Sequence, residues 1–259
     1  MLTDGCANIG VFNLKPIGSL TFSTMVLTVN TLSKHRALTT AVAVGVGAAV
    51  LYGAMRLARA RVYDALIVKL TTGWYAHVLK RLPAKSRLLD VGVGTGAALA
   101  NNHGLLTSKG VKVDGVDYDP DYVKRCRELL AECQLDAHVA VHHASIYDFT
   151  GGPYDGVYFS ASLMLMPDPV EALRHCAKML KPGGHVYVTQ TIQTRRSKLV
   201  EVGKPLLKFL TTIDFGTVTY EADLLATFKK AGLKLVENVA ISGSSMSSTR
   251  SYRLFVLHT

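Results

Sequence analysis

The sequence predicts an α/β fold in which a seven-stranded, mostly parallel sheet carries helices on both faces. Short apolar segments alternate with amphipathic segments from residue 85 onward, which is the pattern of parallel strands joined by crossover helices. Only the Ser-rich stretch 242–249 separates the last two apolar segments, so we expect these two strands to pair antiparallel at the sheet edge. A chain of 259 residues suffices for one substantial domain with an appendage.

The N-terminal third is expected to contain a membrane anchor. Residues 1–36 are rich in Ser, Thr and Asn and contain one acid, as in a tail or targeting segment. Residues 37–55 carry no charge and have basic residues on both sides. About 19 residues just cross a bilayer core as a helix, so we predict a transmembrane helix at 37–57. A buried Ala-rich helix and a cleaved signal are the alternatives.

The flanking charges also predict an orientation. The heavier basic flank follows the apolar segment, so the positive-inside rule puts the large domain on the cytoplasmic or matrix face of a single-pass protein, in the endoplasmic reticulum or a mitochondrion. Small residues recur at every fourth position, at Ala41, Gly45, Ala49 and Gly53. Such a stripe lets helices approach closely in lipid, and it predicts a homodimer.

Residues 58–84 are expected to form an amphipathic lead-in helix, broken at 71–73 and ended by Pro83. The main domain then covers residues 85–259. Its strands are predicted from their apolar runs at 87–91, 111–117, 137–143, 154–160, 184–190, 234–240 and 250–258. Its helices are predicted at 96–109, 120–133, 169–180, 196–210 and 220–231.

Charge and cysteine content argue against two kinds of partner, nucleic acid and a metal ion. The net charge is +10, but residues 1–84 hold nine Lys and Arg against two acids, and residues 85–259 hold twenty against seventeen. Because the domain itself is almost neutral, we do not expect it to bind nucleic acid. The four cysteines show no metal-ligand spacing, so we expect reduced thiols and no metal site.

The segment most informative about function is RLLDVGVGTG at 87–96. A short apolar strand ends here, and Gly92, Gly94 and Gly96 follow it, with Thr95 inside the turn. Glycines permit positive φ and let a ligand approach the backbone closely. The segment therefore predicts a nucleoside-binding loop.

Two acids identify the nucleoside. Asp90 would repel the pyrophosphate of a dinucleotide, but it would attract a sulfonium nucleoside with a free amino group, which favours S-adenosylmethionine over NAD. Asp117 ends the next strand, 21 residues beyond Gly96, where an acid can accept both ribose hydroxyls. Tyr118 can stack on the adenine. Asp117 as a helix cap is the alternative, but the Asp–Pro pair at 119–120 serves that purpose better.

Together with YDGVYFS and LRHCAKMLKPGGHVYVTQ, the segments LLDVGVGTG and GVDYDP resemble the class I S-adenosylmethionine-dependent methyltransferases over about residues 62–259. The resemblance implies a Rossmann-like fold and S-adenosylmethionine as cofactor. It implies that the three loop glycines wrap the methionine and ribose, that Asp90 lies by the sulfonium and amino end, and that Asp117 holds the ribose.

The same resemblance implies roles in cofactor binding for residues at the ends of the third and fourth strands. In HHASIYDF, Ser145 and Ile146 would cover the adenine, and Ser160 would lie behind the methionine. Many family members have Asp where Ser145 stands, so the adenine amine would meet a hydroxyl or backbone groups here, with Asp148 close by as a partial substitute.

The acceptor is less clearly marked. SASLMLMPDP after the fourth strand lacks the (D/N)PPY motif that clamps a planar amino group, and it lacks the cysteine of C5-pyrimidine methylation. We expect Ser162 and Met164 to form an adaptable apolar wall for the substrate, with ordinary core packing as the alternative. Tyr63 and Tyr75 are expected to close over the cofactor.

These features predict a membrane-tethered methyltransferase that acts on a small apolar or lipid-like acceptor by O-, S- or C-methylation. Methyl transfer depends mainly on in-line positioning, so the absence of an acid–base pair excludes nothing. A cofactor-binding assembly protein with little activity, suggested by Ser145, and an RNA or protein methyltransferase are the alternatives.

Overall fold

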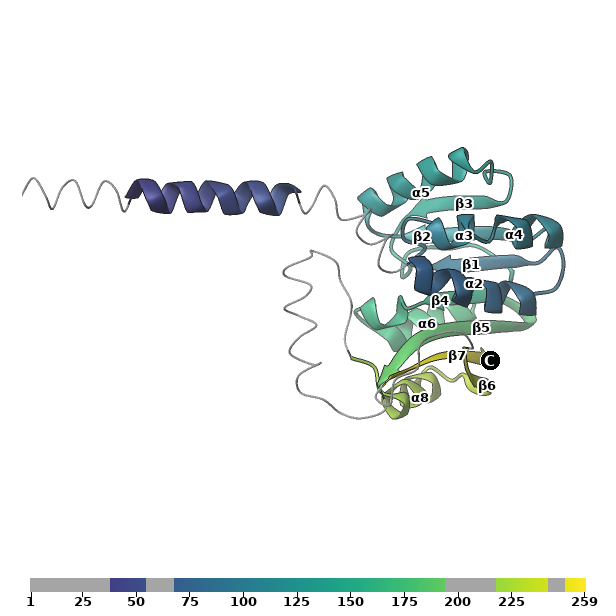
Figure 1. The fold of residues 1–259 in the computed structure, drawn as a ribbon. Helices are drawn as coiled ribbons and strands as arrows, with labels where there is room; N and C mark the ends of the chain where they lie inside the picture. The colour runs from purple at the N-terminus through teal and green to yellow at the C-terminus, as the bar shows by residue number, and fades with distance from the viewer. Residues whose placement is uncertain (1–37, 55–67, 194–217, 242–249) are drawn as a thin grey trace, which may run out of the picture. The chain divides into compact units, whose positions relative to one another are not determined.

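The computed structural model describes residues 38–54, 68–193, 218–241 and 250–259, and the chain divides into two compact units, Met1–Gly53 and Ala54–Thr259 (Figure 1). The predicted helices at 196–210 and before residue 68, together with Tyr63, lie outside the described residues.

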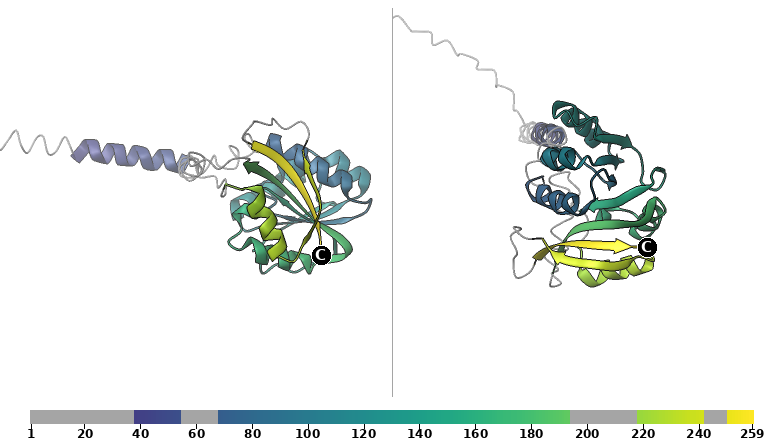
Figure 2. Two further views of the ribbon diagram at one scale, coloured as in Figure 1. Left: turned by 90° about the horizontal axis from the view of Figure 1, so that it is seen from below. Right: turned by 90° about the vertical axis from the view of Figure 1, so that its right-hand side faces the viewer.

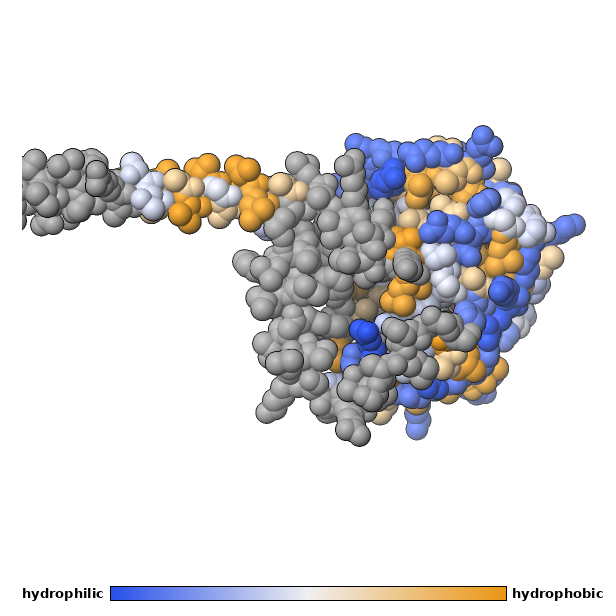
Figure 3. All heavy atoms as spheres, in the orientation of Figure 1, coloured by the Kyte–Doolittle hydropathy of each residue, from blue (hydrophilic) through white to orange (hydrophobic). Residues whose placement is uncertain are grey.

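The described part of the N-terminal unit is a helix that begins at residue 38. Its large apolar side chains are exposed, Val50 to 68%, and they appear as an apolar surface in Figure 3. A Cβ added to Gly45 or Gly53 would meet no described atom within 4 Å. Among the described residues no helix is both long enough and apolar enough to cross a membrane. The transmembrane helix predicted for 37–57 is therefore not found in that part of the chain.

The larger unit is built on one seven-stranded sheet in the order β3-β2-β1-β4-β5-β7-β6. Strands β1 to β5 are parallel to one another, whereas β7 is antiparallel to both β5 and β6. The strands are β1 Arg87–Val91, β2 Lys112–Asp117, β3 Val139–His143, β4 Tyr154–Ser160, β5 Leu180–Gln193, β6 Lys234–Ala240 and β7 Arg250–His258. The predicted sheet and the antiparallel pairing of its last two strands are confirmed.

Helices cover both faces of this sheet (Figures 1 and 2). One buried cluster joins α2, α3, α4 and α5 to the first face, and a second joins α6 and α8 to the other. The bounds are α2 Lys69–Arg81, α3 Ala97–Ala100, α4 His103–Lys109, α5 Pro120–Glu132, α6 Pro169–Ala177 and α8 Glu221–Lys230. A short 3-10 helix, η2 Leu163–Leu165, follows β4.

Helix α2 shows that the predicted break at 71–73 is wrong, because the helix runs through it. The hydroxyls of Thr71 and Thr72 donate to the Val68 carbonyl, at 3.4 and 2.7 Å, so these polar side chains are satisfied inside the first turn. Trp74 packs against Tyr252 of β7 with ring centroids 5.7 Å apart. Packing on the sheet therefore outweighs the weak helix propensity of this segment.

The helix predicted at 96–109 is two helices, α3 and α4, and Asn102 lies at the junction. Its amide nitrogen donates to the carbonyls of Ala98 and Thr72, at 2.7 and 3.0 Å. A buried side chain that bonds the backbone in this way competes with the helical ladder. At α5 the prediction is confirmed, because Asp119 accepts from two backbone N–H groups and Pro120 begins the helix.

Candidate functional site

The predicted cofactor residues meet at the carboxyl edge of the sheet. Strands β1, β2, β4 and β5 are parallel, so their C-terminal ends share one edge, where ligands of open α/β sheets bind. The glycine loop follows β1, Asp117 ends β2 and Ser160 ends β4. The candidate site is built from these three segments.

The loop after β1 depends on glycine for its conformation. Gly92, Gly94 and Gly96 have φ of +78°, +60° and +71°, in the region that residues with a Cβ rarely adopt. Gly92 N–H donates to the carbonyl of Val116 over 2.8 Å, which joins the loop to β2. Thr95 is buried inside the turn, as its position in the motif predicts.

Two side chains from other elements pack directly on this loop. A Cβ on Gly92 would lie 2.6 Å from Ser162 Cβ, and one on Gly96 would lie 2.5 Å from Cys126 Sγ. Ser162 also donates to the Val91 carbonyl and is only 3% exposed. Ser162 was expected in the substrate wall, but the structure has it behind the glycine loop, which it holds in place. Cys126 was not singled out in the sequence, because helical spacing marks it only as a core residue.

Asp90 is fully buried beneath the loop. Its Oδ2 accepts a hydrogen bond from the Tyr75 hydroxyl over 2.8 Å, and its Oδ1 has no partner among the described residues. The pKa of Asp90 is raised to about 7, mainly by burial; the Tyr75 bond lowers this pKa and the Asp117 charge raises it. Asp90 therefore presents a carboxylate oxygen that lacks a donor.

The sequence predicts that Tyr75 closes over the cofactor from the membrane side. The side chain is buried on α2, where its ring meets that of Tyr158 edge to face with centroids 4.8 Å apart. Tyr75 therefore supports Asp90 from the buried face of α2, and a contact of its side chain with the cofactor stays a prediction.

Asp117 is held in place by backbone groups. Its Oδ2 accepts from Gly94 N–H over 2.9 Å and its Oδ1 from Asp119 N–H over 3.0 Å. Burial, the largest cause, raises the pKa of Asp117, and the two backbone bonds lower it. A carboxylate offers about four lone-pair sites, so acceptor capacity remains for ribose hydroxyls. Tyr118 beside it is 73% exposed, so its ring is accessible for stacking.

Ser145 and Ile146, which are predicted to cover the adenine, lie in the loop after β3. Ser145 Oγ accepts from Tyr147 N–H over 3.3 Å, and its carbonyl accepts from Asp148 N–H over 3.1 Å. The Ile146 side chain is buried in the second core cluster. Ser145 therefore shapes the turn, and an Ile146 contact to adenine could only come from its backbone.

Two residues predicted for the site, Ser160 and Met164, lie at the end of β4 and just after it. Met164 contacts Gln190, a polar residue that was not predicted from the sequence. Ser160 is buried, and its Oγ has no partner within the described ranges. Met164 Sδ accepts from Gln190 Nε2 of β5 over 3.0 Å. Gln190 also donates to Thr219 Oγ1 over 3.2 Å. Met164 therefore contacts a buried amide just after β4, and its role in a substrate wall stays a prediction.

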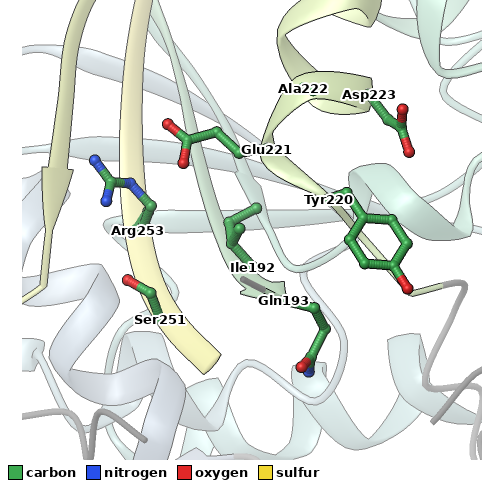
Figure 4. Close-up of a pocket in the computed structure, with 8 residues that line it drawn as sticks. All are labelled: Ile192, Gln193, Tyr220, Glu221, Ala222, Asp223, Ser251 and Arg253. Atoms are coloured by element: carbon green, nitrogen blue, oxygen red, sulfur yellow. The ribbon is translucent and has the colours of Figure 1, made fainter. Parts of the chain in front are cut away.

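A cavity of about 370 Å³ opens at the carboxyl end of β5 (Figure 4). It is lined by Ile192, Gln193, Tyr220, Glu221, Ala222, Asp223, Ser251 and Arg253. This cavity was not predicted from the sequence. A usable signal was present, since Gln190, Ser251 and Arg253 are polar residues at positions that alternate with the apolar core residues of two buried strands.

These residues fit a nucleoside that carries a positive charge. The donorless Asp90 oxygen suits a cationic amino group, the glycine loop lets the backbone approach the ligand, and Asp117 suits a diol. A pyrophosphate would meet two buried carboxyl groups instead.

Comparison with known proteins agrees with this arrangement. A family described as "Methyltransferase domain" matches residues 88–184. A ubiquinone biosynthesis O-methyltransferase of Xanthomonas axonopodis pv. citri (strain 306) is 33% identical over 171 residues, which cover 61% of this chain and 67% of that protein. A phosphatidylethanolamine N-methyltransferase of Cereibacter sphaeroides is 29% identical over 154 residues, covering 57% and 72% of the two chains.

The fold is shared with solved structures at lower sequence identity. Geranyl diphosphate methyltransferase, solved in complex with S-adenosylmethionine, superposes with a TM-score of 0.59 at 16% identity. The superposition covers 75% of this chain and 87% of that one.

Proposed function

This chain belongs to the class I S-adenosylmethionine-dependent methyltransferases, and we propose that it methylates a small, largely apolar acceptor that it meets at a membrane surface. The acceptor class is supported by two of the relatives, which are named for ubiquinone biosynthesis and for phosphatidylethanolamine. Both names refer to molecules with long hydrocarbon chains.

The chain's own residues explain how the cofactor is held. When bound, S-adenosylmethionine supplies an electrophilic methyl group on a positively charged sulfur. Asp90 Oδ1 would accept from its amino group, Asp117 would accept from the ribose hydroxyls, and Tyr118 would stack on the adenine. Tyr75 keeps Asp90 oriented through the 2.8 Å bond. Ser162 and Cys126 keep the glycine loop in one conformation by packing where a Cβ would be.

The remaining task is to position the acceptor and exclude water. Ser160 ends β4, and Met164 lies in the short 3-10 helix that follows it. Met164 offers an adaptable apolar surface, and Gln190 fixes its sulfur. Correct in-line positioning alone can supply a large part of the rate enhancement, so a nucleophile that is already deprotonated requires no general base from the chain.

The observation that carries the membrane part of the proposal is the helix at 38–54. It contains no charged residue, and its large apolar side chains are exposed. Exposed contiguous apolar surface of this kind marks an interaction site. We assign it to lipid, with the domain on the cytoplasmic or matrix side, and the stripe from Ala41 to Gly53 to a second copy of the helix.

The acceptor class is tested by incubating the full chain with S-adenosylmethionine labelled in its methyl group. A lipid extract and a water-soluble extract of the same cells are supplied in parallel. We expect the label in the organic phase. Label in RNA or protein would favour that alternative class. Calorimetric binding of the cofactor without any transfer would favour the assembly protein.

The membrane contact is tested separately by sedimentation with phosphatidylcholine vesicles. Val46→Lys with Val50→Lys should release the full chain, because charged side chains oppose burial of this apolar surface in lipid. The matched control, Val46→Leu with Val50→Leu, keeps the apolar surface and should remain bound. Equal release of both variants would contradict the assignment.

A further inference from the structure

We propose that Tyr147 is a positioning residue, which couples the loops that hold the cofactor to the loop that receives the acceptor. Its hydroxyl donates to the Asp168 carbonyl and accepts from the Asp168 N–H, both over 2.9 Å. The two residues lie in the β3 loop, residues 144–149, and in the β4 loop, residues 161–168, which follow those strands. The inference rests on the proposed function for the place of the acceptor at the β4 loop.

The β3 loop begins at the acid that is assigned to the ribose. Ala144 N–H donates to the carbonyl of Asp117 over 3.0 Å, and the Asp117 side chain accepts from Gly94 N–H over 2.9 Å. Tyr147 follows Ala144 closely along the same loop. A ligand that orders Gly94 and Asp117 therefore also acts on the segment that carries Tyr147.

The β4 loop begins against the glycine loop. Ser162 donates to the Val91 carbonyl, and its Cβ lies 2.6 Å from the place of a Cβ on Gly92. Leu165 N–H donates back to the Ser162 carbonyl over 2.9 Å. The 3-10 turn that carries Met164 is therefore built directly on a residue that touches the cofactor loop.

The far end of the β4 loop is fixed at Asp168. The Asp168 side chain accepts from Glu171 N–H over 2.9 Å and caps α6, while its backbone bonds the Tyr147 hydroxyl. The β4 loop is therefore connected at both ends to loops of the cofactor site, through Ser162 and through Asp168. Loss of the Tyr147 hydroxyl would leave only the connection through Ser162.

This double connection suits a reaction that depends on alignment. The Tyr147 ring packs against the second core cluster, so the direction of its hydroxyl is set by the core. Two bonds to one residue then fix the distance between the β3 and β4 loops. Methyl transfer requires such a fixed distance, because a displacement of about 1 Å between reacting groups can lower a rate about a hundredfold.

The test follows amide hydrogen exchange of the full chain with and without saturating S-adenosylmethionine. In the parent protein the cofactor should slow exchange in residues 161–168 about tenfold, because both connections become ordered together. In Tyr147→Phe the slowing should fall to about threefold or less. Equal slowing in the two proteins would overturn the proposal.

Two control variants separate positioning from ordinary stabilisation. Tyr187→Phe removes a hydroxyl from a β5 residue in the first core cluster, and it should behave as the parent does. His175→Phe breaks another bond of the β3 loop, in which His175 Nε2 donates to the Phe149 carbonyl over 2.7 Å. It should lower the thermal midpoint and preserve the slowing in residues 161–168. If His175→Phe removes the slowing as Tyr147→Phe does, the role of Tyr147 is only structural.

Label transfer to the lipid extract gives a second measurement. At saturating cofactor, Tyr147→Phe should lower the rate about tenfold, whereas the cofactor concentration that gives half the maximal rate should change less than about threefold. The opposite pattern, a weakened cofactor with an unchanged maximal rate, would contradict a positioning role.

Cofactor titration of the parent distinguishes the two proposals. Failure of the parent to bind S-adenosylmethionine would refute the proposed function. Normal cofactor binding without slower exchange in residues 161–168 would refute only this inference.

Discussion

The Tyr75 hydroxyl donates a hydrogen bond to Asp90 Oδ2 over 2.8 Å. The bond joins α2, which precedes the sheet, to the carboxyl group at the base of the cofactor loop. Asp90 is buried and its other oxygen has no described partner, so Tyr75 is its one recorded donor among the described residues. The lead-in helix is therefore part of the cofactor site.

Removal of this bond should change the pH dependence of cofactor binding. The pKa of Asp90 is raised to about 7, mainly by burial, and the Tyr75 bond lowers it. Tyr75→Phe should raise that pKa further, by about one unit. The ionised form suits the cationic amino group, so the pH midpoint of S-adenosylmethionine affinity should move upward. Calorimetric titration across the neutral range measures the shift, and identical profiles for both proteins would contradict it.

Asp90 should also make the free protein less stable as the pH rises. Its pKa is about 7 in the folded protein against an ordinary value of 3.8. A raised folded pKa contributes stability that is complete below the unfolded pKa and is lost as pH rises through the folded one. Across that window the loss amounts to at most about 4 kcal/mol.

The isosteric variant Asp90→Asn isolates this contribution. It has no proton to lose, so urea unfolding should show that the free energy of unfolding falls less between pH 4 and 8 than in the parent. The exposed acid Asp136 supplies the control, and Asp136→Asn should follow the parent curve. Parallel curves for Asp90→Asn and the parent would show that Asp90 does not titrate in this window.

Loss of the Asp117 charge should weaken cofactor binding. Asp117→Asn keeps the side-chain shape but replaces one acceptor oxygen by a donor, so it can no longer accept both ribose hydroxyls. We expect a tenfold to hundredfold loss of affinity, on the order of two charge-assisted hydrogen bonds. Calorimetry gives the affinity, and the thermal midpoint shows how far the loop bonds to Gly94 and Asp119 have suffered. Unchanged affinity would refute the ribose assignment.

Gly92→Ala should destabilise the protein and impair cofactor binding together. The new Cβ would lie 2.6 Å from Ser162 Cβ at a φ of +78°, so strain and overlap add to about 3 kcal/mol or more. Gly73→Ala is the matched control. Its Cβ meets nothing within 4 Å, and alanine inside a helix should stabilise the protein by about 0.5 to 1 kcal/mol. Urea denaturation of both variants gives the comparison.

The parts of the fold that were predicted correctly depend on local patterns. The glycine loop follows from the glycines next to an apolar strand, and the cap of α5 follows from Asp119 before Pro120. The predicted helix bounds are wrong where contacts between residues far apart in the sequence determine the structure. Helix α2 continues through Thr71 and Thr72 because its apolar face packs on the sheet, and Asn102 divides α3 from α4 by bonding another helix.

The same distinction applies to the candidate site. Asp90, Gly94 and Asp117 were found because acids and glycines at strand ends have a direct chemical meaning. Ser162 was assigned to the substrate because its sequence neighbours suggest an open loop, whereas its contacts are with Gly92. Tyr75 is predicted from the sequence to close over the cofactor, because helical periodicity shows which face of the helix carries a side chain but not which residue it contacts.

The sequence by itself therefore determined the fold class and the cofactor, because strand periodicity, glycine spacing and the two acids are properties of short segments. Tertiary structure decided which side chains support the loop and where a polar cavity opens. Ser251 lies beside Ile192, and Arg253 beside Gln190, because β5 pairs with β7. These residues are far apart in the sequence, so no local pattern predicts that they are neighbours. The cavity at the end of β5 therefore depends on hydrogen bonds between strands that are distant in the sequence and on the burial of their side chains away from water.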